Sequence, residues 1–113
     1  MSAAKRMKIE EIRGLLGLAR RANRLSIGSR ETRMALRRGE VRLVLVAADA
    51  SPRDRERLMR VAEEEHVPAR TVEDRASLGQ AIGAGDVTAV GVRDSGMAEA
   101  LEARLKTIEG GEA

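Results

Sequence analysis

Apolar residues recur at intervals of three and four positions in five segments of the chain, the spacing that places them on one face of a helix. In the first segment, for example, Ile9, Ile12 and Leu16 fall on such a face. Together with the residue types at the segment ends, this spacing predicts helices at residues 9–22, 29–38, 51–65, 74–82 and 94–108.

Capping residues support three of these helix starts. Ser51 followed by Pro52 is a typical start, because the hydroxyl can accept a hydrogen bond from the first turn and proline fits that turn. Asp74 can cap the short fourth helix, and either Asp94 or Ser95 can cap the last one. Each of these three helices therefore has a local reason to begin where the apolar spacing begins.

Glycines give two further expectations. Gly39 follows the second helix, where glycine commonly ends a helix. Gly14 and Gly17 lie inside the first helix, where each costs about 1 kcal/mol relative to alanine. We expect close packing against a neighbouring element to explain both of them.

Four short segments between the helices read as strands. Residues 43–48 are apolar at every position, which is typical of a central strand covered on both faces. Residues 87–92 form a second buried strand, and residues 25–28 a very short strand or extended link. Residues 69–72 follow Pro68, which favours an edge or entry position for that strand. The alternation predicts an α/β fold, a three-layer α-β-α sandwich around a small sheet whose strand order the pattern does not reveal.

The size of the chain, 113 residues, predicts a single domain over residues 1–113 with an ordered core at about 8–107. Leu105 and Ile108 continue the apolar face of the last helix, and residues 110–113 are expected to fray. The chain has no cysteine, no apolar signal core after its basic first residues and no run long enough to span a bilayer. We therefore expect a cytoplasmic protein.

The distribution of charge narrows the function. Residues 1–60 carry 16 Lys and Arg against 7 Asp and Glu, whereas residues 61–113 carry 5 against 11. One charged run would more often be a solvated helix face, but here the cations recur over several elements, which favours a polyanion-binding face. Phe, Tyr and Trp are absent, which excludes RNA binding through aromatic stacking platforms.

The most informative stretch is residues 28–34, where a glycine and a serine precede a helix whose first turn carries Arg30, Glu31 and Arg33. The free amides and the positive dipole of such a terminus can hold a phosphate, and Glu31 can accept a hydrogen bond from a base edge. The alternative is an ordinary helix start, in which Ser29 bonds a backbone amide.

The stretch at residues 28–34, the apolar strand ending at Asp49, and residues 78–83 together resemble the kink-turn RNA-binding family of ribosomal-protein-like domains. The later part of the first helix, residues 14–22, is similar to the YlxQ-like bacterial branch. The resemblance covers roughly residues 9–105. It implies a mixed four-stranded sheet and a non-catalytic protein that binds structured RNA, with ribosomal RNA and the ribosome as candidate partners.

The resemblance also implies a site. Its residues lie at a helix start, at a strand end and in a loop. They are Gly28, Ser29, Arg30, Glu31, Arg33, Met34, Asp49, Ala84, Gly85, Asp86 and Val87. Arg37 and Arg75 are weaker candidates that would steer phosphates. No cofactor, metal or catalytic residue is expected, and the free protein is expected to be a monomer.

Three positions depart from the family pattern and leave other functions open. Arg30 replaces an Asn, Met34 replaces a Lys, and Ala48 precedes Asp49 where the family has Glu. A protein-interaction module with a reduced RNA surface is therefore an alternative. An enzyme acting on a phosphorylated ligand has weaker support, because glycines near helix ends are the only feature that suggests it.

Overall fold

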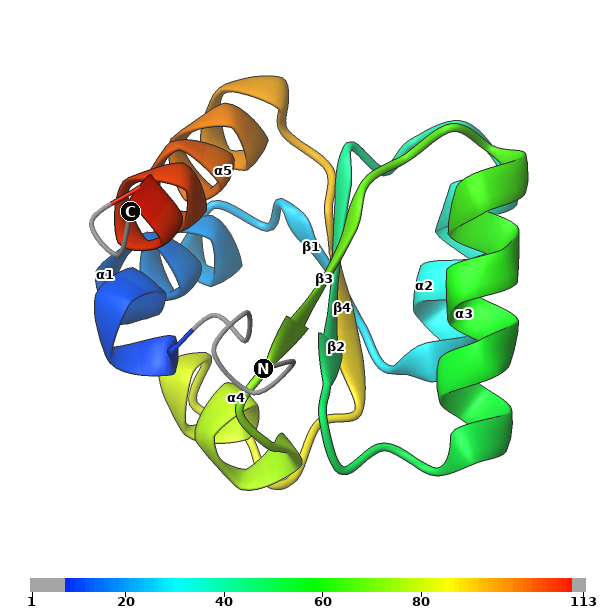
Figure 1. The fold of residues 1–113 in the computed structure, drawn as a ribbon, viewed down its shortest axis with the longest axis horizontal. Helices are drawn as coiled ribbons and strands as arrows, with labels where there is room; N and C mark the ends of the chain where they lie inside the picture. The colour runs from blue at the N-terminus through cyan, green and yellow to red at the C-terminus, as the bar shows by residue number, and fades with distance from the viewer. Residues whose placement is uncertain (1–7, 111–113) are drawn as a thin grey trace.

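The computed structural model describes residues 8–110, with side chains through Arg104. It contains five helices and four strands in these residues (Figure 1). In chain order they are α1 (Ile9–Arg21), β1 (Leu25–Ile27), α2 (Ser29–Arg37), β2 (Leu43–Ala47), α3 (Pro52–Glu64), β3 (Ala69–Val72), α4 (Arg75–Ala81), β4 (Ala89–Val92) and α5 (Ser95–Gly110). Gly110, expected to fray with residues 111–113, is the last residue of α5. Residues 111–113 and the side chains of Leu105 and Ile108, which were expected to point inward, lie outside what is described.

The four strands form one mixed sheet in the order β1-β4-β2-β3. β2 pairs in parallel with β3, while β4 runs antiparallel to both β1 and β2. The strand that follows Pro68 is an edge strand, as expected from a residue that cannot donate to a ladder. The predicted three-layer α-β-α architecture is confirmed.

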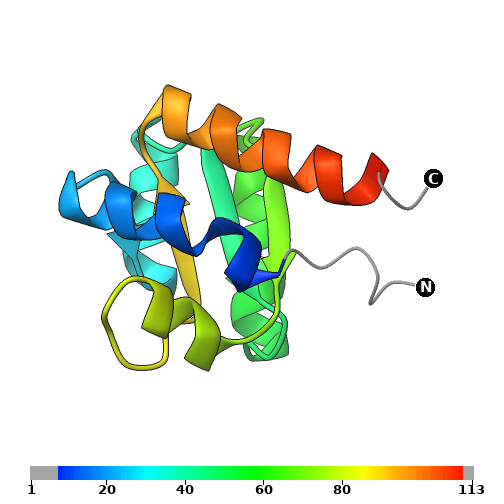
Figure 2. The same cartoon turned by 90° about the vertical axis from the view of Figure 1, so that its left-hand side faces the viewer.

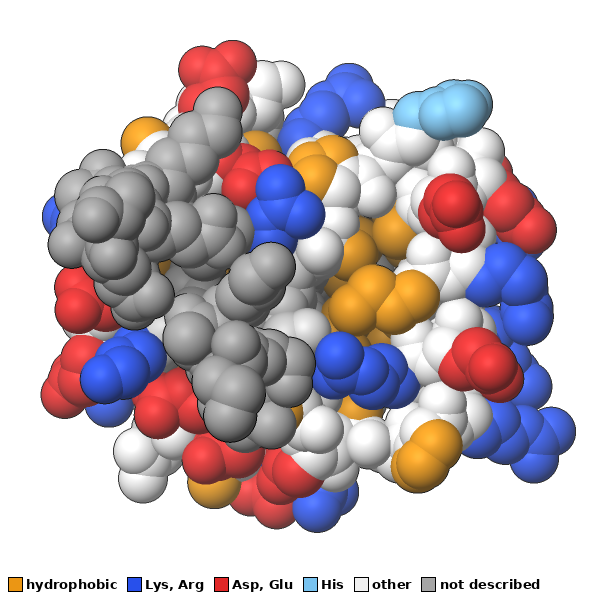
Figure 3. All heavy atoms as spheres, viewed as in Figure 1, with side chains coloured by type: hydrophobic (Ala, Val, Ile, Leu, Met, Phe, Trp, Pro, Cys, Tyr) orange, Lys and Arg blue, Asp and Glu red, His pale blue; other side chains and the backbone are white. Residues whose placement is uncertain are grey.

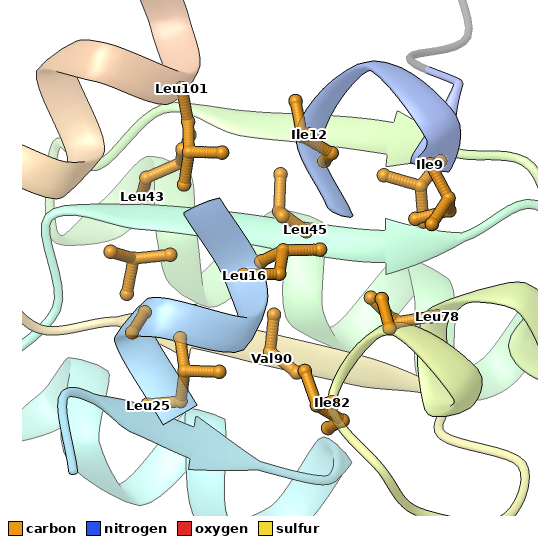
Figure 4. Close-up of a cluster of buried hydrophobic side chains, with 14 of the residues drawn as sticks. Ile9, Ile12, Leu16, Leu25, Leu43, Leu45, Leu78, Ile82, Val90 and Leu101 are labelled. Atoms are coloured by element: carbon orange, nitrogen blue, oxygen red, sulfur yellow. The ribbon is translucent and has the colours of Figure 1, made fainter. Parts of the chain in front are cut away.

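Helices cover both faces of this sheet. α1, α4 and α5 lie on one face and α2 and α3 on the other (Figures 1 and 2). β2 is buried along its whole length because its side chains alternate between two cores. Leu43 and Leu45 join the cluster beneath α1, α4 and α5 (Figure 4), whereas Val44 and Val46 join the cluster beneath α2 and α3.

Two expectations from the sequence are wrong. Gly14 is exposed and a Cβ there would meet nothing within 4 Å, so no neighbour explains this glycine. A Cβ added at Gly17 would make only ordinary contacts, 3.5 Å from an Arg21 guanidinium nitrogen and 3.7 Å from the Ala81 carbonyl oxygen. β4 begins at Ala89 and not at residue 87. The Val87 amide donates to the Arg75 carbonyl at 3.1 Å, so this residue is tied to α4 and not to the sheet ladder.

Candidate nucleic-acid interface

Three segments meet at one end of the sheet, the lower end in Figure 1: the start of α2, the end of β2 and the loop that leads into β4. Backbone hydrogen bonds hold them together. The Gly28 amide donates to the Ala89 carbonyl at 2.8 Å, and the Ala47 amide donates to the Thr88 carbonyl at 2.9 Å. The sheet therefore brings together the helix start, the strand end and the loop that the family resemblance implied.

Gly28 determines how the chain enters α2. It is the residue before the helix and has φ 103° and ψ 159°, a conformation that is essentially restricted to glycine. With its amide bonded to Ala89, this backbone turns the chain from the edge of the sheet onto its face, and Arg30 and Glu31 of the first turn are left at the molecular surface. A side chain at this position would strain the turn that presents the site.

The start of α2 lacks the side-chain acceptor found at the starts of the other described helices. Ser51, Asp74 and Asp94 accept hydrogen bonds from first-turn amides of α3, α4 and α5, and Glu73, distant in sequence, accepts from the first amide of α1, all at 2.7–3.2 Å. No side chain among the described residues does this for α2. Its first-turn amides are therefore open to an external acceptor, at the positive end of the helix dipole.

The side chains of this first turn are unpaired as well. The Ser29 hydroxyl is buried and has no hydrogen-bond partner among the residues that the structure describes, so it does not form the cap that an ordinary helix start would have. Arg30 and Glu31 are exposed, and neither makes an ion pair with a described residue. The turn thus offers donors, a cation and a carboxylate acceptor on one surface.

In the following turns of α2, one arginine has an unpaired nitrogen and another forms ion pairs within the protein. Arg33 is half-buried with an unpaired Nε, and Met34 is 42% exposed, an unusual state for an apolar side chain. Arg37, at the far end of the helix, donates to Glu64 at 2.7 Å and to Glu65 at 3.1 Å. Hydrogen bonds to these two glutamates raise the pKa of Arg37, and its charge is already neutralised within the protein.

Asp49 and Arg75 form a contact of their own. The Asp49 carboxylate accepts from the Arg75 amide at 2.9 Å, and its other oxygen lies 3.5 Å from the Arg75 guanidinium. Beside them, Asp74 accepts from the Ser77 amide at 2.7 Å, and this hydrogen bond lowers the pKa of Asp74. Asp49 therefore joins the end of β2 to the start of α4, and it makes no hydrogen bond or ion pair with the described residues of α2.

The loop at residues 84–87 is held against α4 by the absence of a side chain at Gly79. A Cβ there would lie 2.7 Å from the Gly85 carbonyl carbon and closer still to its oxygen. The Ala84 amide also donates to the Gly79 carbonyl at 2.8 Å. Ala84, Gly85 and Asp86 are exposed, whereas the Val87 side chain lies in the core. The Val87 side chain, unlike those of the other three expected residues, is therefore turned away from a ligand at this surface.

Other kinds of site find no support in the described residues. Among residues 8–110, no cluster of three or more His, Cys, Asp or Glu side chains could hold a metal ion. His66 follows α3 at the opposite end of the molecule from the α2 start, with φ 59° (Figure 3). None of the described helices has the length and apolarity needed to cross a membrane.

Comparison with known proteins places this geometry in a family. The model of the ribosomal protein L7Ae/L30e/S12e/Gadd45 family matches residues 10–102. The chain belongs to this family. A relative, the RNA-binding protein YlxQ of Bacillus subtilis (strain 168), is 36% identical over 87 residues, which is 77% of this chain and 87% of the relative.

Solved structures of the L7Ae/L30e/S12e/Gadd45 fold agree. A protein of unknown function from Bacillus halodurans C superposes with a TM-score of 0.80 and 33% identity, covering 83% of this chain and 95% of that one. The 15.5kD RNA binding protein of Giardia lamblia has a TM-score of 0.75 with 20% identity, covering 88% and 86%. At this lower identity the likeness concerns the fold.

Sequence analysis missed two residues in this member of the L7Ae/L30e/S12e/Gadd45 family. Arg57 and Arg60 of α3 line the same groove as Arg33 and Met34 of α2. The signal was available, because Arg53, Arg57 and Arg60 recur at helical spacing opposite the apolar face of α3. The prediction for that helix rested on its inward apolar residues and did not consider these arginines.

Proposed function

We propose that this protein is a non-catalytic RNA-binding protein that holds structured RNA at the start of α2 and the adjoining loop. The observation that carries the proposal is the open first turn of α2, where the amides lack a side-chain cap and Ser29 and Arg30 lack partners. Phosphate oxygens satisfy such amides and pair with arginine. Membership of the family and the RNA-binding name of its Bacillus subtilis relative support this ligand class.

The proposed RNA is bent or irregular, with kink-turn elements of ribosomal RNA as the first candidates. In the proposed complex, Glu31 accepts from a base edge while Arg30 and Arg33 pair with phosphates. The exposed backbone of residues 84–86 contacts the unstacked bases beside the bend. Arg30 and Met34 at the positions where the family has Asn and Lys shift the balance from base contacts towards phosphate contacts.

The cellular setting belongs to the same proposal. The chain acts as one domain over residues 1–113, monomeric when free and working in the cytoplasm, where ribosomal RNA and ribosomes are its candidate partners. No cofactor takes part, because binding through amides, guanidinium groups and one carboxylate needs none.

The test compares a kink-turn RNA with a straight duplex of equal length in filter-binding titrations at two salt concentrations. Tighter binding of the kinked RNA that persists at the higher salt supports recognition of the bend. Equal and steeply salt-dependent binding to both would leave only phosphate attraction. Absence of binding to either RNA would refute the proposal and favour a protein-interaction module, for which the exposed Met34 is the motivating feature.

The site itself is tested with Arg30→Glu combined with Arg33→Glu. The matched control reverses the same number of charges on the opposite face of the sheet, with Arg13→Glu and Arg21→Glu in α1. A loss of affinity in the first variant well beyond that in the control locates RNA at α2. Equal losses in both variants would mean that net charge, and not this site, determines binding.

A further inference from the structure

A second basic surface lies next to the proposed RNA site. α2 and α3 pack side by side, and between their outer faces runs a groove of about 300 Å³. Figure 3 shows Lys and Arg side chains along the outer side of α3, at the right of the view. The residues that line the groove are Arg33, Met34, Arg37, Arg57, Arg60 and Val61.

Three of the four arginines in the groove lack an acidic partner. Arg37 occupies both nearby carboxylates, Glu64 and Glu65. Arg33, Arg57 and Arg60 make no hydrogen bond or ion pair with any other residue that the structure describes, and Arg33 Nε is buried without an acceptor. Since guanidinium groups stay charged at any physiological pH, the groove carries uncompensated positive charge.

The groove begins at the proposed RNA site. α2 and α3 both start at the same end of the sheet, and the Arg37 pairs with Glu64 and Glu65 join their far ends (Figure 1). A ligand held at the first turn of α2 would meet Arg33 next and then Arg57 and Arg60. The latter two stand about 4.5 Å apart along the axis of α3. The three free arginines therefore continue the first site along one path and do not form a separate patch.

The chemistry of the groove selects its occupant. Guanidinium groups bind phosphate oxygens in pairs of hydrogen bonds, and the absence of aromatic residues excludes stacking of bases on aromatic rings. We propose that the α2–α3 groove binds the sugar–phosphate backbone of RNA that extends from the element held at the start of α2. This inference rests on the proposed function. Arg57 and Arg60 each contact a phosphate, and Met34 and Val61 provide an apolar floor beneath the strand.

The test uses the full chain with Arg57→Gln and Arg60→Gln, and two kink-turn RNAs that differ only in the length of one flanking helix. Each lost phosphate contact lowers the slope of log K against log salt by about 0.7–0.9, so the double variant should lose about 1.4–1.8. At 0.1 M salt this corresponds to roughly 25- to 60-fold weaker binding of the longer RNA. The control is Arg13→Gln with Arg21→Gln, which removes the same charge from α1.

The outcomes separate this proposal from the one it rests on. Wild-type protein should prefer the longer RNA, the groove variant should lose that preference, and the control should keep it, with circular dichroism melts showing that all three are folded. Unchanged affinity and slope in the groove variant would overturn the groove proposal while RNA binding at α2 stands. A wild-type protein that binds neither RNA would overturn both.

Discussion

Gly79→Ala tests whether the close approach of α4 and the loop at residues 84–87 determines the shape of the candidate site. The added Cβ would lie 2.7 Å from the Gly85 carbonyl carbon, against about 3.5 Å for an unstrained contact. The obstacle is backbone, so rotation of a side chain cannot relieve it. Either α4 or the loop must shift by about 1 Å, and the Ala84 amide then loses its 2.8 Å bond to the Gly79 carbonyl.

The cost follows from these two effects. Overpacking in a well-filled region costs about 1–3 kcal/mol, and the lost hydrogen bond adds about 1 kcal/mol. The middle of the range for the two effects together is ~3 kcal/mol. For 113 residues, an unfolding entropy of about 2.1 cal/mol/K per residue converts this destabilisation into a fall in Tm of about 12 °C. Because the loop moves, affinity for the kink-turn RNA should fall at temperatures where the variant is folded.

The assay is thermal melting by far-ultraviolet circular dichroism, since the chain has no aromatic residue for fluorescence. Gly14→Ala is the matched control, because this glycine is exposed in the middle of α1 and its Cβ would meet nothing. Alanine should stabilise there by about 1 kcal/mol and raise Tm by about 4 °C. If Gly79→Ala melted at or above the wild-type temperature, the reasoning about the loop would be refuted.

Four further substitutions test the helix starts. Gly28→Ala should destabilise by about 1–3 kcal/mol in melts, because alanine is strained at φ 103°, and an unchanged Tm would contradict the described entry into α2. Ser51→Ala should cost about 1 kcal/mol and Ser29→Ala almost nothing, since only the first hydroxyl caps a helix; equal losses would contradict this difference. Asp74 has a lowered pKa in the folded state, so its contribution is complete above the unfolded value near 3.8 and is lost as pH falls through the lower, folded one. The Tm difference between wild type and Asp74→Ala should therefore be constant near neutrality and shrink in acid, and a difference that grows below pH 4 would contradict the cap.

Much of the fold follows from local pattern. β2 was predictable because the residues pointing to each face are apolar, as a strand between two helical layers requires. Strand order was not, because pairing joins β1 to β4 and β2 to β3 across long stretches of chain, and apolar spacing carries no information about partners. The start of β4 was misplaced for a similar reason. Val87 is apolar and buried like a strand residue, but its amide bonds to α4, a contact distant in sequence.

The candidate site shows where reasoning from sequence stops. A glycine followed by serine before a helix suggests a serine cap, but the cap position is one residue earlier, at Gly28, because the Gly28 amide is tied to Ala89 in β4. Ser29 is thereby moved into the first turn, where its hydroxyl finds no acceptor or donor within the protein. The same strand pairing that builds the sheet therefore leaves the start of α2 uncapped. Sequence identifies the residues of this turn, but only the tertiary pairing explains why their hydrogen-bonding groups remain open to a ligand.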